Sequence, residues 1–159
     1  MIRRAFYFLR SVFAVGEDIG RDDITDFYYT FENINYHAKY QRYRFYTEDG
    51  AYFFYHETRE RPDAYGPTTE ADITIYGTAE LSGEEWQSFF SYIKGGTVRK
   101  RRKTSTAGDS GPWMYIYWKN DRSVCQEYSF VSYESCKDFE AYCAYLASKK
   151  AGAGAQDKK

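Results

Sequence analysis

The pair Asp49-Gly50 separates two strongly aromatic segments, and it constrains the fold of this chain more than any other short feature. The flanking residues 40–47 and 51–58 are rich in Tyr and Phe, which favour β-strands. A tight turn needs residues that accept positive φ, and an Asp-Gly pair meets this need. The sequence therefore predicts a β-hairpin across residues 40–58.

Four further segments have the composition and alternation of strands: residues 24–31, 72–78, 113–118 and 123–131. The last two flank Lys119-Asn120-Asp121-Arg122 and predict a second hairpin. Residues 59–71 and the glycine-rich residues 97–112 are expected to be loops.

The segment that follows residue 81 carries the clearest helix signal. Ser82-Gly83-Glu84-Glu85 is a capping box, in which the serine hydroxyl and the Glu85 carboxylate each satisfy an orphan amide. Trp86, Phe89, Phe90 and Ile93 then recur at helical spacing, and Gly95-Gly96 ends the pattern. A second helix is predicted over residues 135–147, and a third over residues 1–15. The apolar face of the second consists of Cys136, Phe139, Cys143 and Leu146.

These elements predict an α+β domain: an antiparallel sheet of about five or six strands with two amphipathic helices on one face. A hairpin followed by a helix occurs twice, in residues 40–95 and 113–148, as an internal ββα echo. With 159 residues, the chain fits one domain over residues 1–148. Residues 1–20 form its N-terminal helical segment, and residues 149–159 are expected to be a flexible tail.

Aromatic residues make up 21% of the chain, with 18 Tyr among them. In 52–55 and 115–118, both alternating sets of side chains are large, so one set faces the helices and the other faces solvent, a partner or a ligand. We expect a non-enzymatic binding or interaction module, with a protein or peptide partner or a second copy of the chain. The candidate contacts are Tyr43, Tyr52, Tyr55, Tyr115 and Tyr117. The alternative is that the rings cover the sheet with their hydroxyls in water.

Five consecutive cations, Arg99, Lys100, Arg101, Arg102 and Lys103, form a second candidate site. Such a run can bind a nucleic-acid backbone or an acidic partner. The alternative is a solvated strand edge, where cations discourage aggregation. The formal net charge of −1 argues against dedicated nucleic-acid binding.

No catalytic residue, metal site or cofactor is predicted. Gly108-Asp109-Ser110-Gly111-Pro112 resembles the segment around the nucleophile of chymotrypsin-like serine proteases, but it lacks one glycine. Neither His37 nor His56 has the context that such a serine requires. A small enzyme with an unrecognised site stays an alternative, and a deep pocket that places a histidine beside a carboxylate would favour it.

Three cysteines, Cys125, Cys136 and Cys143, form no Cys-x-x-Cys pair, so we expect reduced thiols in a cytoplasmic protein. No stretch approaches the roughly 18 consecutive apolar residues of a membrane-spanning helix.

The C-terminal third carries Trp113-Met-Tyr-Ile-Tyr-Trp-Lys-Asn-Asp-Arg, then Tyr128-Ser-Phe, then Phe139 and Leu146. This pattern resembles one found in small uncharacterised α+β proteins of anaerobic Gram-positive bacteria, which have a Trp-x-Leu-x-Ile-x-Tyr strand, an Asp-Gly turn, a second strand and a helix. Here Asp121-Arg122 replaces Asp-Gly, and Ser-Tyr-Glu-Ser replaces the proline before the helix. The resemblance implies no activity and transfers no functional residue.

Overall fold

A computed structural model of the chain describes residues 12–35, 37–101, 112–119 and 125–150. Seven strands are present: β1 (Ile24–Asn33), β2 (Ala38–Glu48), β3 (Ala51–Arg61), β4 (Ile73–Leu81), β5 (Val98–Lys100), β6 (Trp113–Trp118) and β7 (Cys125–Phe130). They are accompanied by the helices α2 (Gly83–Ile93) and α3 (Tyr133–Lys150) and by a short 3-10 helix, η1 (Glu70–Asp72).

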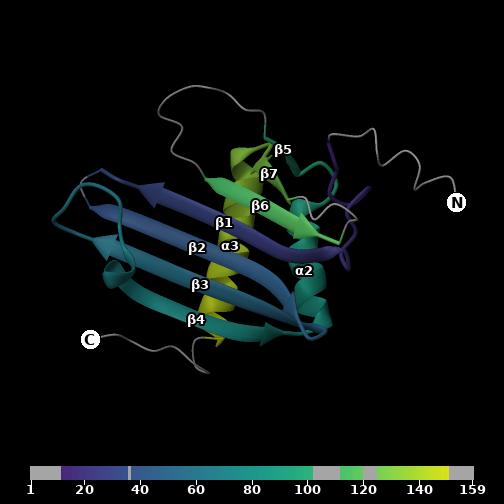
Figure 1. Cartoon of the computed structure of the whole chain (residues 1–159), viewed down its shortest axis with the longest axis horizontal. Coiled ribbons are helices and arrows are strands. Elements are labelled where there is room, and N and C mark those ends of the chain that lie inside the picture. The colour runs from purple at the N-terminus through teal and green to yellow at the C-terminus, as the bar shows by residue number, and fades with distance from the viewer. Residues whose placement is uncertain (1–11, 36, 102–111, 120–124, 151–159) are drawn as a thin grey trace, which may run out of the picture.

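All seven strands form one antiparallel sheet in the order β4-β3-β2-β1-β6-β7-β5 (Figure 1). The chain first builds a meander from β1 to β4 and then passes through α2. It returns to the far side of β1 with β5, β6 and β7, so the first strand becomes the central one.

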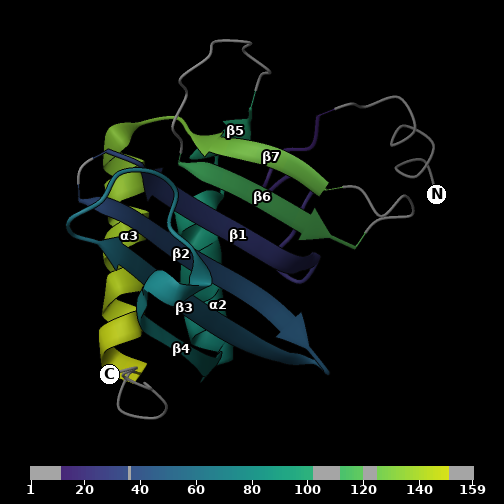
Figure 2. The ribbon, with the colours of Figure 1, turned by 60° about the vertical axis from the view of Figure 1, so that its left-hand side comes forward.

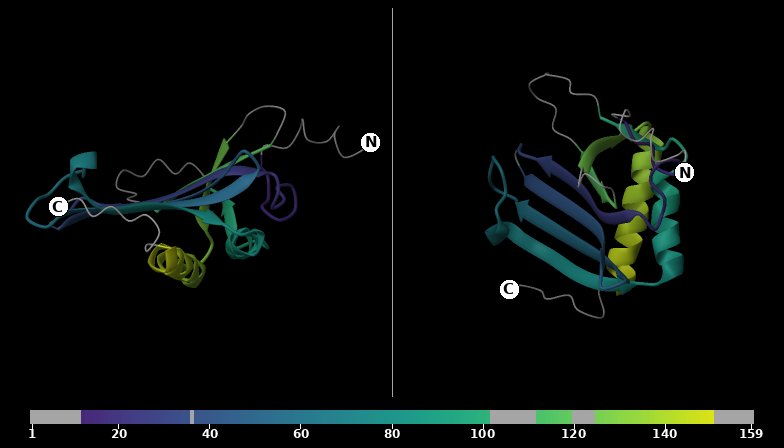
Figure 3. Two further views of the ribbon diagram at one scale, coloured as in Figure 1. Left: turned by 90° about the horizontal axis from the view of Figure 1, so that it is seen from below. Right: turned by 45° about the vertical axis from the view of Figure 1, so that its right-hand side comes forward.

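Both helices cover the same face of the sheet, whereas η1 and the β3–β4 connection curl towards the opposite face (Figures 2 and 3). The predicted α+β class and the two helices are confirmed. The number of strands is seven rather than five or six. The additional strand is β5, which has three residues and lies in a segment expected to be a loop. It is too short for a visible alternation, and pairing with β7 defines it.

The structure confirms the hairpin turn that Asp49-Gly50 predicts. Asp49 and Gly50 have φ values of 50° and 79°, which a two-residue turn with positive φ at both positions requires. The register then places Phe45 opposite Phe54. Both side chains are almost fully buried beneath the helices.

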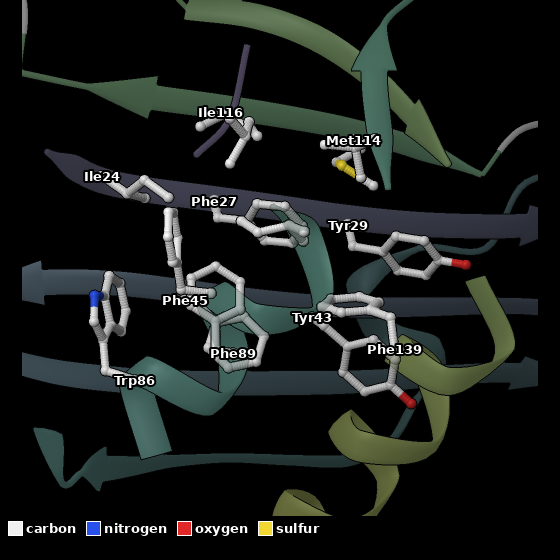
Figure 4. Close-up of a cluster of buried hydrophobic side chains, with 14 of the residues drawn as sticks. Ile24, Phe27, Tyr29, Tyr43, Phe45, Trp86, Phe89, Met114, Ile116 and Phe139 are labelled. Atoms are coloured by element: carbon white, nitrogen blue, oxygen red, sulfur yellow. The ribbon is translucent and has the colours of Figure 1, made fainter. Parts of the chain in front are cut away.

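The core between sheet and helices is built mainly from aromatic rings (Figure 4). Phe45 and Phe89 stack with centroids 4.0 Å apart, and Phe27 meets Phe89 edge-on at 5.1 Å. Phe139 from α3 packs 5.3 Å from the ring of Tyr29. The two helices therefore dock through complementary rings, whose burial supplies the main driving force for folding.

The N-terminus of α2 forms the predicted capping box. The Ser82 hydroxyl accepts a hydrogen bond from the Glu85 amide at 3.1 Å, and Glu85 accepts one from the Ser82 amide at 2.8 Å. Lys150 at the end of α3 lies 2.9 Å from the Glu85 carboxylate. The helix α3 runs to Lys150, so residues 149 and 150 belong to it rather than to the expected tail.

The predicted N-terminal helix is wrong at residues 12–15, and residues 1–11 lie outside the described part. Val15 instead forms a β-bridge with Ile19, across a turn in which Gly16 has a φ of 93°. The Asp18 carboxylate accepts a hydrogen bond from the Ala14 amide. Both Val15 and Ile19 are buried, so packing of a tight loop against the core overrides the helical periodicity.

Among the described helices, none is both long and apolar enough to cross a membrane.

Candidate binding face

The sheet face opposite α2 and α3, here called the open face, carries alternating tyrosines, arginines and acids. Phe27, Phe45 and Phe54 point into the core, so their neighbours along each strand point the other way. The strand register aligns one row across the open face: Glu127, Tyr115, Tyr28, Arg44 and Tyr55.

Arginine side chains lie over the tyrosine rings of this face. The Arg44 guanidinium is 4.2 Å from the ring centroid of Tyr46 and 5.0 Å from that of Tyr28. The Arg42 guanidinium is 4.9 Å from the Tyr28 centroid and 5.8 Å from the Tyr55 centroid. These distances are typical of cation–π contacts. The open face is therefore an interlocked Tyr–Arg layer rather than a set of separate rings in water.

Carboxylates neutralise part of this layer. Asp26 accepts two hydrogen bonds from Arg44, at 3.0 and 2.6 Å, in the bidentate geometry of strong arginine–carboxylate pairs. Glu57 is only 3% exposed although it points towards the open face. Its carboxylate accepts hydrogen bonds from the Tyr55 hydroxyl at 2.6 Å and from Arg59 Nε. Burial and the hydrogen bond to Glu57 raise the pKa of Tyr55, so its hydroxyl remains a donor.

Three of the five predicted tyrosines lie on the open face. Tyr55 and Tyr115 belong to the central row, and Tyr117 is 41% exposed at the end of β6. The Tyr117 ring meets Tyr28 edge-on at 6.0 Å.

Tyr43 and Tyr52 lie instead on the helix side, which corrects their assignment as surface contacts. Tyr43 is buried and stacks on Tyr29 and Phe54. Tyr52 stacks on Trp86 of α2 with centroids 4.6 Å apart. Period-two alternation groups side chains by face, but it does not say which face the helices cover.

The five cations of the predicted basic run do not form one described cluster. Arg99 and Lys100 belong to β5, and Arg102 and Lys103 lie outside the described residues. Arg101 lies 3.3 Å from Glu127 and 4.0 Å from the ring centroid of Trp113. Arg101 thus joins the open face instead of a free basic patch.

His56 and its neighbour Glu57 lie on opposite faces of the sheet. His56 is buried on the helix side, stacked on Phe54, whereas the adjacent Glu57 points to the open face. Burial lowers the pKa of His56. His37 is exposed and has a φ of 62° before β2. Within residues 12–35, 37–101, 112–119 and 125–150, no group of three or more His, Cys, Asp or Glu side chains could hold a metal ion.

All three cysteines are free thiols. Cys136 and Glu140 of α3 contact the buried hydroxyl of Tyr29. Burial raises the pKa of the Cys136 and Cys143 thiols, which favours the unreactive protonated form.

The chain matches no protein-family model, no curated protein and no solved structure.

Sequence reasoning missed the arginines of the open face. Arg42 and Arg44 alternate with Gln41, Tyr43 and Phe45 in the β2 segment. A pair of arginines two residues apart in a predicted strand places both on the same face, and that signal could have identified them.

Proposed function

We propose that this protein is a binding module that receives a polypeptide partner on the open face of its sheet. The observation that carries this proposal is the concentration of tyrosine and arginine on the face opposite the helices. Tyrosine and arginine are enriched at binding hot spots, because both combine a large contact area with directional polar groups.

A polypeptide suits this layer better than a nucleic acid. A nucleic-acid backbone is bound by several cations that neutralise successive phosphates. On the open face, Asp26 and Glu57 already neutralise Arg44 and Arg59, and Glu127 neutralises Arg101. Binding to nucleic acid or to an acidic partner through residues 99–103 is the weaker alternative, and a steep loss of affinity with added salt would favour it.

A display selection tests the proposal. Random peptides are selected on the wild-type protein and then measured against Tyr117→Glu on the open face and Tyr145→Glu on α3. The two tyrosines are exposed to similar extents, 41% and 53%, on different sides of the molecule. We expect the selected peptides to lose binding to Tyr117→Glu by about tenfold or more and to keep binding to Tyr145→Glu. Equal binding to both variants, or failure to select any peptide, would contradict the proposal.

Self-association through β4 is a second candidate function, favoured by a contrast between the two edges of the sheet. The β5 edge is three residues long and carries Arg99 and Lys100, which discourage pairing with another strand. The β4 edge is nine residues long, has Glu80 as its sole charge, and contains neither proline nor lysine. Ile75 on this strand is 49% exposed.

The β4 sequence is compatible with antiparallel pairing to a second copy. A register centred on Tyr76 would place Ile75 opposite Gly77, Ile73 opposite Ala79 and Thr74 opposite Thr78. The paired residues 73–79 carry no charge, and apolar side chains would meet on the helix side. Glu80 would face Asp72 of the other copy only beyond the two ends of this paired segment. We propose that a homodimer forms through this edge.

Light scattering on a sizing column, over a dilution series, tests whether the protein dimerises through the β4 edge. The wild-type protein should be a dimer that dissociates on dilution, and Ile75→Lys should be a monomer throughout. Ile34→Lys is the matched control, because Ile34 is 53% exposed and lies outside β4. A wild-type monomer at every concentration, or an Ile75→Lys dimer, would exclude pairing through β4.

The three free thiols fit a reducing compartment such as the cytoplasm, which we propose as the site of action.

A further inference from the structure

Arg42 lies near the centre of the open face, with Thr30 of β1 and Glu57 of β3 as its cross-strand neighbours. It differs from the other arginines of this region in what it contacts. Four of them have a carboxylate within salt-bridge distance: Arg44 with Asp26, Arg59 with Glu57, Arg61 with Asp72, and Arg101 with Glu127. Arg99 is exposed at the edge, where water can solvate it.

Arg42 is half-buried and forms no salt bridge with any residue in the described part of the chain. Its Nε atom is buried and has no hydrogen-bond acceptor. The carboxylate on the opposite strand, Glu57, is directed to Tyr55 and Arg59 instead. Among the described residues, this guanidinium therefore has aromatic neighbours but no anion.

Two rings border the guanidinium, those of Tyr28 and Tyr55. A cation–π contact compensates part of the lost hydration of an arginine, but it leaves the N–H donors without acceptors. A planar oxyanion that meets the terminal nitrogens end-on would satisfy two of those donors at once. The buried Nε itself would not take part in this contact.

We infer that Arg42 is an oxyanion receptor on the open face, and that its ligand is the carboxylate of an Asp or Glu side chain of a polypeptide partner. This inference rests on the proposed function and names the group that the face recognises. One unpaired, half-buried cation matches one carboxylate. A polyanion would bring further negative charges towards Asp26 and Glu57, which like-charge repulsion disfavours.

A direct test follows the guanidinium Cζ resonances of the arginines by NMR while sodium acetate is added, with sodium chloride at equal ionic strength as the baseline. The Arg42→Gln variant assigns the Arg42 signal. We expect the Arg42 signal to shift towards saturation with acetate, whereas the signal of Arg44, already held by Asp26, stays in place. An Arg42 signal that moves no more than that of Arg44 would overturn the inference. A larger response to inorganic phosphate than to acetate would overturn the assignment to a carboxylate.

A second test uses the peptides selected on the open face. For a peptide containing Glu, Arg42→Gln and the Glu→Gln peptide should each weaken binding about tenfold, and the two changes together should cost little more than either alone. Arg42→Lys should recover only part of the affinity, because an ammonium cannot form the planar two-point contact.

The two proposals fail differently. Peptides that need Tyr117 but bind Arg42→Gln as tightly as the wild type would refute the oxyanion receptor and leave the binding face intact. Peptides that ignore Tyr117 would refute the binding face, whatever the acetate titration shows. Circular dichroism and the unfolding midpoint of each variant establish that it is folded.

Discussion

The imidazole ring of His56 on β3 lies over Gly77 on β4, so closely that a Cβ atom at Gly77 would meet His56 Nε2 at 3.0 Å. The two residues are cross-strand partners on the helix side of the sheet. A glycine here leaves room for a buried ring rather than enabling a special backbone conformation, since its φ is not positive.

Gly77→Ala should therefore destabilise the fold by about 1 kcal/mol, because the added methyl forces the His56 ring out of its stack with Phe54. Urea unfolding monitored by circular dichroism measures the change. Thr78→Ala, an exposed position on the same strand, is the control and should change stability by less than about 0.5 kcal/mol. A Gly77→Ala protein as stable as the wild type would mean that the ring moves without cost.

The buried His56 predicts a stability that depends on pH. Burial lowers its pKa in the folded state below the ordinary value of 6.5. Between those two pKa values the unfolded chain binds a proton that the folded protein does not, so stability is lost as the pH falls below about 6.5 and is regained above it. Urea midpoints measured from about pH 5 to pH 7.5 test this window, in which ordinary carboxylates remain ionised.

A His56→Gln variant should lose most of that pH dependence, since glutamine does not titrate. His37→Asn, which replaces the exposed histidine by a residue that tolerates positive φ, should retain it. If both variants follow the wild-type curve, the pH dependence has another source.

The capping box of α2 should contribute measurably to stability. Ser82→Ala removes the acceptor for the Glu85 amide, and we expect a loss of about 1 kcal/mol in the free energy of unfolding. Ser91→Ala is the matched control within the same helix, where alanine is the better helix former, and it should be neutral or slightly stabilising. A cost for Ser91→Ala equal to that for Ser82→Ala would show a general loss of helix packing instead.

The three thiols should differ in their reaction with iodoacetamide. Cys143 is fully buried with a raised pKa, so it should remain unmodified in the native protein and react only after unfolding in guanidinium chloride. Peptide mass spectrometry of the alkylated protein identifies each site. Modification of Cys143 at the native rate of Cys125, which is only partly buried, would reveal frequent opening of α3.

Local signals in the sequence were sufficient to predict turns and helix starts, because one or two residues determine the backbone conformation there. Asp49-Gly50 determined the central turn, and Ser82 with Glu85 determined the start of α2. Short-range patterns failed at Val15, where burial against the core defines the local conformation, and at β5, where pairing with β7 does.

The candidate site depended more strongly on the tertiary structure. Alternation in the sequence separated Tyr43 from Arg42 and Arg44, but the docking of Phe89 and Phe139 decided which set became the core. The sequence also could not predict that Glu57 turns to Tyr55 and Arg59 and leaves Arg42 without a carboxylate. Turns and caps are fixed by the local chemistry of neighbouring residues. The covering of one sheet face and the pairing of charges across strands depend on residues far apart in the chain, which only the folded sheet brings together.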